Sequence, residues 1–194
     1  MNKLSTTADD ILRCARTLIV TGGYNGFSYA DIADVVGIRK ASIHHHFPSK
    51  AALVLTLVEQ YRKAAEDAMH GLEQQVPGAV AQLQAYLGYW KSCIGDASAP
   101  FCVCALLAGE LPLLPAEVAL EVRAYFRFLA GWLTAVLERG AASSAIVLRQ
   151  DARLEAEVLM ATVHGAMLSA RAYGDSGIFG NIMDAQLARL AATA

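Results

Sequence analysis

Three consecutive histidines, His44, His45 and His46, are the residues of this chain whose type and spacing most suggest chemistry. Imidazole nitrogens bind transition metals, and they also donate or accept hydrogen bonds at phosphates and base edges. Adjacent residues of a helix point about 100° apart, so three in a row cannot close around one metal ion. The run lies inside the stretch IRKASIHHHFPSK, which argues against a purification tag. The pattern favours contact with a polyanion and predicts no metal site.

The charge distribution supports a small basic head on a larger acidic body. Residues 1–50 hold six Lys and Arg against four acids, whereas residues 51–194 hold ten against fourteen. The first quarter is therefore net +2 before its histidines are counted, and the remainder is net −4. This asymmetry is typical of a polyanion-binding segment joined to another domain.

The composition is that of a globular chain with a well-filled core. Hydrophobic residues make up 55% of the 194 residues and charged residues 18%. The longest uncharged apolar run, residues 97–109, is too short to span a bilayer, and no signal-peptide pattern opens the chain. We expect a cytoplasmic protein without a membrane partner. The cysteines lie in apolar helical patterns rather than in a disulfide framework: Cys14, Cys93, Cys102 and Cys104.

Nearly all of the chain is predicted to be helical. A start signal at Thr7 and Asp10 opens the first helix, which ends at Gly22-Gly23, and Ser28 with Asp31 opens the second. The third runs from about Arg39 to His46. Further helices are predicted at about 50–75, 79–94, 101–111, 115–139, 151–173 and 178–192, with breaks at 95–100, 112–115, 140–144 and 174–177. The fold class is all-α, with about nine helices.

The turn Val36-Gly37-Ile38 joins two short helices in the helix-turn-helix pattern, whose second helix enters the major groove. Ile43 and Phe47 lie 40° apart on that helix and define its buried face. The residues that then point most nearly outward are Ala41, Ser42 and His45, with His44 and His46 on the flanks. Basic residues at either end suit phosphates: Arg39, Lys40 and Lys50.

Residues 6–60 resemble a known family. The stretch ILRCARTLIVTGGYNGFSYADIADVVGIRKASIHHHFPSKAALVLTLVEQY is similar to the DNA-binding segment of the tetracycline-repressor (TetR) family of bacterial transcriptional regulators. The resemblance implies that Ser28, Arg39, Lys40, Ser42, His44, His45 and Lys50 face DNA, and helix geometry adds Ala41. The family usually has an aromatic residue at the position of His44 and often Tyr at that of His46. His46 either contacts DNA or packs against the first helix.

The resemblance also implies a two-part molecule, with a DNA-binding head at residues 1–48 and an effector-binding and dimerisation domain at residues 49–194. Large amphipathic side chains in the middle helices can line a cavity for a small, mostly apolar ligand. Tyr61, Tyr86, Trp90, Cys102, Phe126 and His164 are the candidates, with Phe101, Tyr125, Phe128 and Trp132 of the same kind. The alternative is that these side chains are ordinary core.

The last two helices carry a candidate surface for a second copy of the chain. Ala161, Gly165, Ala166, Ser169 and Ala170 form a face of small residues, and the following helix has an apolar stripe through Ile178, Ile182, Leu187 and Leu190. Such helices from two subunits can pack as a four-helix bundle. The same pattern also fits packing within one chain.

Cys102 raises a separate possibility. It is predicted to fall in the first turn of a helix that follows Pro100, where free N–H groups and the helix dipole favour a thiolate. The alternative is a small apolar filler, because free cysteine is often buried.

The chain has no convincing nucleophile–base pair, phosphate loop or metal-spaced cluster, so we predict neither an enzyme nor a cofactor. The predicted function is a dimeric repressor that a small apolar effector releases from palindromic, double-stranded operator DNA. The alternatives are a regulator that senses electrophiles or oxidants through Cys102, and a DNA-binding adaptor without an effector.

Overall fold

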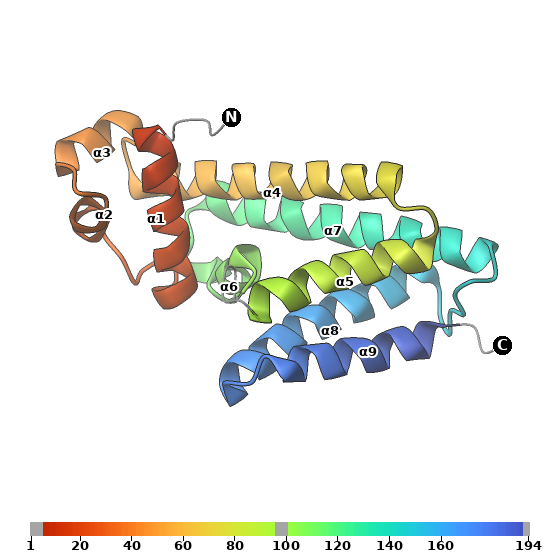
Figure 1. The fold of residues 1–194 in the computed structure, drawn as a ribbon. Coiled ribbons are helices and arrows are strands. Elements are labelled where there is room, and N and C mark those ends of the chain that lie inside the picture. Colours follow the sequence, from red (N-terminus) through yellow and green to blue (C-terminus); the bar gives the residue numbers. More distant parts are fainter. Residues whose placement is uncertain (1–5, 96–100, 192–194) are drawn as a thin grey trace. The chain divides into compact units, whose positions relative to one another are not determined.

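The computed structural model describes residues 6–95 and 101–191, and these residues confirm the all-α fold class (Figure 1). Within them lie nine α-helices, one 3-10 helix and a single isolated β-bridge between Ile146 and Ala191. The elements are α1 (Thr7–Gly22), α2 (Tyr29–Val36), α3 (Lys40–His46), α4 (Lys50–Gln75), α5 (Ala79–Gly95), α6 (Val103–Gly109), η1 (Leu111–Leu113), α7 (Ala116–Ala142), α8 (Ala152–Tyr173) and α9 (Gly177–Leu190).

Capping hydrogen bonds set where the helices start. At α1 they show a start that differs from the predicted one. Thr6 is the N-cap of α1: its hydroxyl accepts the Asp9 N–H at 3.2 Å, and the Asp9 carboxylate accepts the Thr6 N–H at 3.0 Å. The predicted start signal at Thr7 and Asp10 was therefore wrong by one residue. The sequence TTADD contains the same spacing twice, and the spacing alone does not say which copy caps the helix. The predicted capping box at Ser28 is confirmed.

The sixth helix is shorter than predicted. It starts at Val103, with Cys102 as its N-cap, and it ends at Gly109. Cys102 therefore precedes the first turn, whereas the sequence analysis placed it inside that turn. The predicted break at 95–100 lies, apart from Gly95, outside the described residues, as does residue 192 of the last predicted helix.

The chain divides into two compact units, Met1–Lys63 with Cys102–Tyr125, and Ala64–Phe101 with Phe126–Ala194. In the first unit, α1 packs against α2, α3 and α6. Side chains with no exposed surface fill the core of its three short helices: Ile11, Ile19, Ile32 and Ile43. These units are defined by which residues pack together, so they differ from the predicted functional division at residue 48. That division remains a prediction about where DNA and effector bind.

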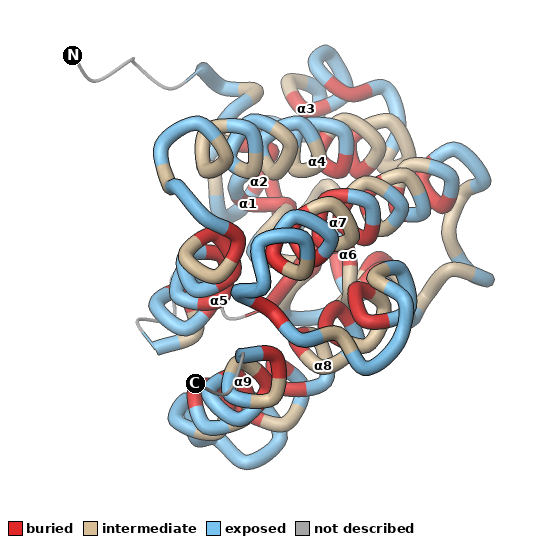
Figure 2. The backbone as a smooth tube through the Cα atoms, turned by 90° about the vertical axis from the view of Figure 1, so that its right-hand side faces the viewer, coloured by how far each residue is buried: buried red, intermediate tan, exposed pale blue. Residues whose placement is uncertain are grey.

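In the second unit, α8 and α9 run antiparallel and side by side (Figure 1). Their shared core includes the fully buried side chains of Leu159, Val163, Met167 and Phe179. Figure 2 shows buried residues recurring as short patches along each helix, separated by exposed ones, as expected for amphipathic helices. Within the described residues, no helix combines the length and apolar content that a membrane span needs.

Candidate nucleic-acid interface and buried sites

Local hydrogen bonds fix both ends of α2 and so set the turn that leads into α3. The Ser28 hydroxyl accepts the Ala30 N–H at 3.2 Å, and the Asp31 carboxylate accepts the Ser28 N–H at 2.7 Å. These bonds to Ser28 lower the pKa of Asp31. Gly37 ends α2 in the left-handed region, at φ 74°, and its N–H donates to the carbonyl of Ala33. The chain then turns into α3 with an extended Arg39 as N-cap.

The structure confirms the predicted buried face of α3. Ile43 has no exposed surface and Phe47 is 7% exposed. The residues predicted to face DNA lie on the other sides: Arg39, Lys40, Ala41, His44 and His45 are exposed, and Ser42 is half-buried. His46 is also exposed, so it is not packed away beneath the first helix. In the described part of the chain, no group of three His, Cys, Asp or Glu side chains is close enough to hold a metal ion.

Tyr29 positions α3, a role that no sequence pattern indicated. Its hydroxyl donates to the carbonyl of Phe47 at 2.8 Å, and burial raises its pKa to about 12. The His44 ring packs edge-on against the Tyr29 ring, with 4.8 Å between centroids. His44 Nδ1 lies 3.4 Å from the carbonyl oxygen of Pro48, a contact that needs the proton on Nδ1. The neutral ring then presents Nε2 as an acceptor.

Contacts within the protein fix the side chain of Lys50. Its ammonium donates to the carbonyl of Phe27 and lies 4.1 Å from the centroid of the Phe27 ring and 4.9 Å from that of Tyr24. Burial lowers the pKa of Lys50, and the nearby carboxylates of Asp31 and Glu110 oppose that change. Lys50 therefore has a structural role in addition to the phosphate contact predicted for it.

Two of the predicted ligand residues meet in the interior of the first unit. The Tyr61 hydroxyl donates to Cys102 Sγ at 3.5 Å, and Sγ lies 3.6 Å from the Tyr125 hydroxyl, to which it donates. That donation requires a protonated thiol, and Cys102 has no exposed surface. Burial, with a hydrogen bond to Cys102, raises the pKa of Cys104 well above its ordinary value. Burial of both sulfur atoms thus opposes the exposed thiolate that a first-turn position would favour.

The other four predicted ligand residues lie in the second unit. Tyr86 packs against Trp132 with 5.6 Å between ring centroids, and Phe126 packs against His164 at 5.3 Å. Trp90 is 4% exposed. The buried atoms Trp132 Nε1 and His164 Nε2 have no hydrogen-bond partner among the described residues. Buried polar atoms in folded proteins usually have a hydrogen-bond partner, which is another protein group, an ordered water or a ligand.

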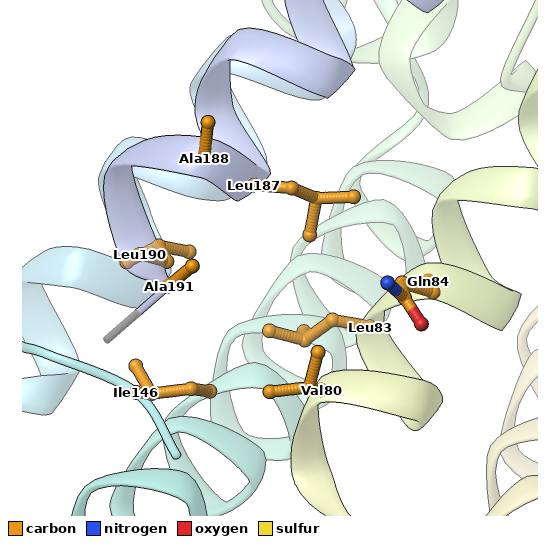
Figure 3. A pocket seen from close by; sticks show the side chains of 8 residues that line it. All are labelled: Val80, Leu83, Gln84, Ile146, Leu187, Ala188, Leu190 and Ala191. Atoms are coloured by element: carbon orange, nitrogen blue, oxygen red, sulfur yellow. The ribbon is translucent and has the colours of Figure 1, made fainter. Parts of the chain in front are cut away.

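A separate groove lies between α5 and α9, with a cavity volume of about 220 Å³ (Figure 3). Gln84 is the one polar side chain among the residues that line it, which are Val80, Leu83, Gln84, Ile146, Leu187, Ala188, Leu190 and Ala191. None of the six predicted ligand residues is in this lining.

The predicted dimer surface divides into two parts. Ala166 is 2% exposed and Ala170 is 4% exposed, so both pack within their own chain, contrary to the prediction. The exposed side of α8 instead runs through Leu154, Ala161, Gly165 and Leu168, of which Leu168 is 59% exposed. On this helix, Ser169 is half-buried, and on α9 so is Ile182. The single-chain structure thus leaves an apolar stripe on α8 open to solvent.

Comparisons with known proteins agree with the arrangement of the helices. Residues 11–57 match a family model described as bacterial regulatory proteins, tetR family. The chain is 63% identical to a transcriptional regulator of the TetR family from Agrobacterium tumefaciens; the match covers 95% of this chain and 97% of that one, with a TM-score of 0.93. A TetR transcriptional regulator from Legionella pneumophila is 26% identical over 98% of this chain and 100% of that one, with a TM-score of 0.87.

A more distant structure shares the fold alone. The regulator FadR from Bacillus subtilis, in complex with stearoyl-CoA, is 17% identical over 93% of this chain and 97% of that one, with a TM-score of 0.72. The comparison with curated proteins found no match.

Proposed function

The chain belongs to the TetR family of bacterial transcriptional regulators, and we propose that it is a dimeric repressor that a small apolar effector releases from a palindromic operator. The exposed face of α3 carries this proposal. It combines a small residue, Ala41, with polar side chains of base-contact length, and its opposite face is locked into the core by Ile43. In this proposal, residues 1–48 bind DNA, and residues 49–194 bind the effector and the second subunit.

Within the DNA-binding surface we assign two kinds of contact. His44 and His45 read base edges in the major groove, with Ala41 allowing close approach and Ser42 adding a hydrogen bond. Arg39 and Lys40 contact phosphates at the start of α3, with Ser28 and Lys50 at the border of the surface.

A test of the DNA-binding role begins with a duplex selected by the wild-type protein from a random-sequence pool. His45→Ala should change which sequences are preferred, because it removes a base contact. Lys40→Ala should weaken binding to all sequences and reduce the slope of affinity against salt by about 1, because it removes a phosphate contact. His70→Ala is the matched control, since His70 is an exposed histidine of α4 outside the assigned surface. Equal losses on every sequence for His45→Ala and Lys40→Ala would contradict the assignment of His45.

The apolar stripe of α8 supports the proposal of a homodimer. Leu154 and Leu168 are 44% and 59% exposed, and Ala161 with Gly165 between them allows two helices to approach closely. With the half-buried Ser169 and with Ile182 of α9, this stripe can pair with its own copy across a two-fold axis. One recognition helix per subunit then matches the two half-sites of a palindrome.

The unpartnered Trp132 N–H supports an effector with a hydrogen-bond acceptor on an apolar body. A buried donor without a partner costs about 1–3 kcal/mol, which a ligand acceptor recovers on binding. Tyr86 and Trp90 lie on α5, and the Tyr86 ring packs against Trp132. Phe126 and His164 offer an apolar ring and a second polar atom. Tyr61 and Cys102 remain candidates from the first unit.

Tryptophan fluorescence can test this part of the proposal because the chain has two tryptophans, Trp90 and Trp132. A Trp90→Phe protein reports on Trp132 alone, and compounds that shift its emission should also release the operator. Binding is coupled in both directions, so operator DNA should weaken effector binding by the same factor. Calorimetry that gives equal effector affinity with and without operator would exclude this mechanism.

A further inference from the structure

The C-terminal end of α6 is fastened to the turn that follows α1. Glu110, the C-cap of α6, accepts the backbone N–H of Tyr24 on its Oε2 at 2.7 Å, across 86 residues of sequence. The same carboxylate covers Gly23, where an added Cβ would lie 1.9 Å from Oε1. Gly23 has φ 75° and ψ −172°, a conformation that is essentially restricted to glycine. The turn is therefore shaped around the Glu110 side chain.

This turn also leads directly into the helix-turn-helix. Tyr24 and Phe27 are 9% and 5% exposed, and their rings flank the Lys50 ammonium, which donates to the Phe27 carbonyl. The segment between α1 and α2 is thus held by an acid at the end of α6 and by a base at the start of α4. Glu110 and Lys50, which hold this segment, both lie outside the three short helices α1, α2 and α3.

The other end of α6 sits in the buried thiol–tyrosine cluster. Cys102, its N-cap, lies between the hydroxyls of Tyr61 and Tyr125. The helix has seven residues, so its two cap residues, Cys102 and Glu110, are only about 12 Å apart at 1.5 Å per residue. A displacement of α6 at Cys102 therefore moves Glu110 as well, because so short a helix shifts as one body.

We propose that Glu110 is a positioning residue, a latch through which α6 holds the α1–α2 turn in the geometry that binds DNA. When α6 shifts at its Cys102 end, the carboxylate leaves the Tyr24 N–H, the turn loosens, and operator affinity falls. This inference rests on the proposed function and adds the route by which the operator-binding segment is controlled.

The test compares Glu110→Ala with Glu110→Gln in the full-length protein. The glutamine keeps an acceptor for the Tyr24 N–H, whereas alanine removes it. We expect Glu110→Ala to speed hydrogen exchange of the Tyr24 amide and to weaken binding to the selected duplex about tenfold, the value of one hydrogen bond to a charged group. Glu110→Gln should restore most of both properties.

A stability control separates the latch from simple weakening of the fold. Thr6→Ala removes the N-cap of α1, so it destabilises the same three-helix segment without touching α6. At a matched loss of melting temperature, Thr6→Ala should bind the duplex more tightly than Glu110→Ala. Equal affinities for these two variants would overturn the proposal.

The coupling along α6 is tested by a double-mutant cycle. Cys102→Val removes both hydrogen bonds to the tyrosines, and Tyr125→Phe removes one of them if the valine variant does not fold. Either change should speed exchange at Tyr24 in the wild-type background and have little further effect in Glu110→Ala. Additive effects would overturn the coupling along α6. Wild-type exchange and affinity in Glu110→Ala would overturn the latch itself, as would a Glu110→Gln protein that binds the duplex as weakly as Glu110→Ala. A wild-type protein that selects no duplex would instead refute the proposed function, and the exchange measurements would still decide whether the latch exists.

Discussion

Replacing Arg189 with methionine should destabilise the pairing of α8 with α9 by leaving a buried charge alone. Glu155 of α8 is 1% exposed and accepts two hydrogen bonds from the Arg189 guanidinium, at 2.6 and 3.2 Å. It also accepts the backbone N–H of Arg149 at 3.2 Å. In Arg189→Met, the carboxylate stays buried without the Arg189 guanidinium and keeps only the backbone N–H and the weaker electrostatic influence of Arg149.

The magnitude follows from this burial. Removing one partner of a fully buried ion pair costs about 3–5 kcal/mol. Because the Arg189 side chain is 25% exposed and water can replace part of it, we expect the free energy of unfolding to fall by about 2–3 kcal/mol at pH 7. Glu155→Leu with Arg189→Met removes both charges and should recover most of that loss, since an apolar pair is often as stable as a buried ion pair.

Urea unfolding followed by circular dichroism measures these differences, with protein concentration held fixed because the proposed dimer would make stability depend on it. Arg153→Met is the matched control. It breaks the Arg153–Glu157 pair on the surface of α8, where both side chains are largely exposed, and should cost less than about 0.5 kcal/mol. A loss for Arg189→Met as small as that of the control would refute the reasoning.

The pH dependence gives a second check with a definite sign. The hydrogen bond from Arg189 holds the pKa of Glu155 below its ordinary value of 4.5. In the wild-type protein, the pair therefore stabilises the fold above pH 4.5 and loses this contribution as the pH falls through the lower folded-state pKa. Without Arg189, burial favours the protonated acid, so the variant should gain stability as the pH falls from 7. The gap between the two proteins should narrow on acidification, and a constant gap would argue against an uncompensated Glu155.

Three further predictions concern single positions. Ser28→Ala removes the cap of α2 and should lower the free energy of unfolding by about 1 kcal/mol, measured by urea titration against Ser92→Ala, which changes an exposed serine within α5, as a control. Leu168→Glu places a charge on the exposed stripe of α8 and should convert the proposed dimer to a monomer in sedimentation velocity, with unchanged helicity; a dimeric variant would remove this stripe from the proposed interface. Cys102 and Cys104 should react with a disulfide reagent far more slowly in the folded protein than in urea, because both are fully buried and burial raises the pKa of the Cys104 thiol; fast reaction of the folded protein would favour direct thiol sensing instead.

Local chemistry explains why the sequence alone determined so much of this protein. The bounds of α4 follow from Ser49 and Pro77, and those of α2 from Ser28 and Gly37, because caps and helix breakers act within a few residues of where they stand. The buried face of α3 followed from the helical period, which places Ile43 and Phe47 together wherever the helix packs. The spacing of these signals is also what carries the family resemblance, which the 63% identical regulator confirms.

The tertiary structure decided which partners these local elements meet. The small-residue face of α8 spans two sides of the helix, and only the tertiary structure shows that Ala166 is buried while Gly165 stays exposed. The contact of Glu110 with Tyr24 joins residues 86 positions apart, and no local pattern marks it. The sequence predicts only a phosphate contact for Lys50, whereas the structure shows that its ammonium donates to the Phe27 carbonyl. Propensity and period act along the chain, whereas burial and pairing depend on residues that the fold brings together from distant parts of it.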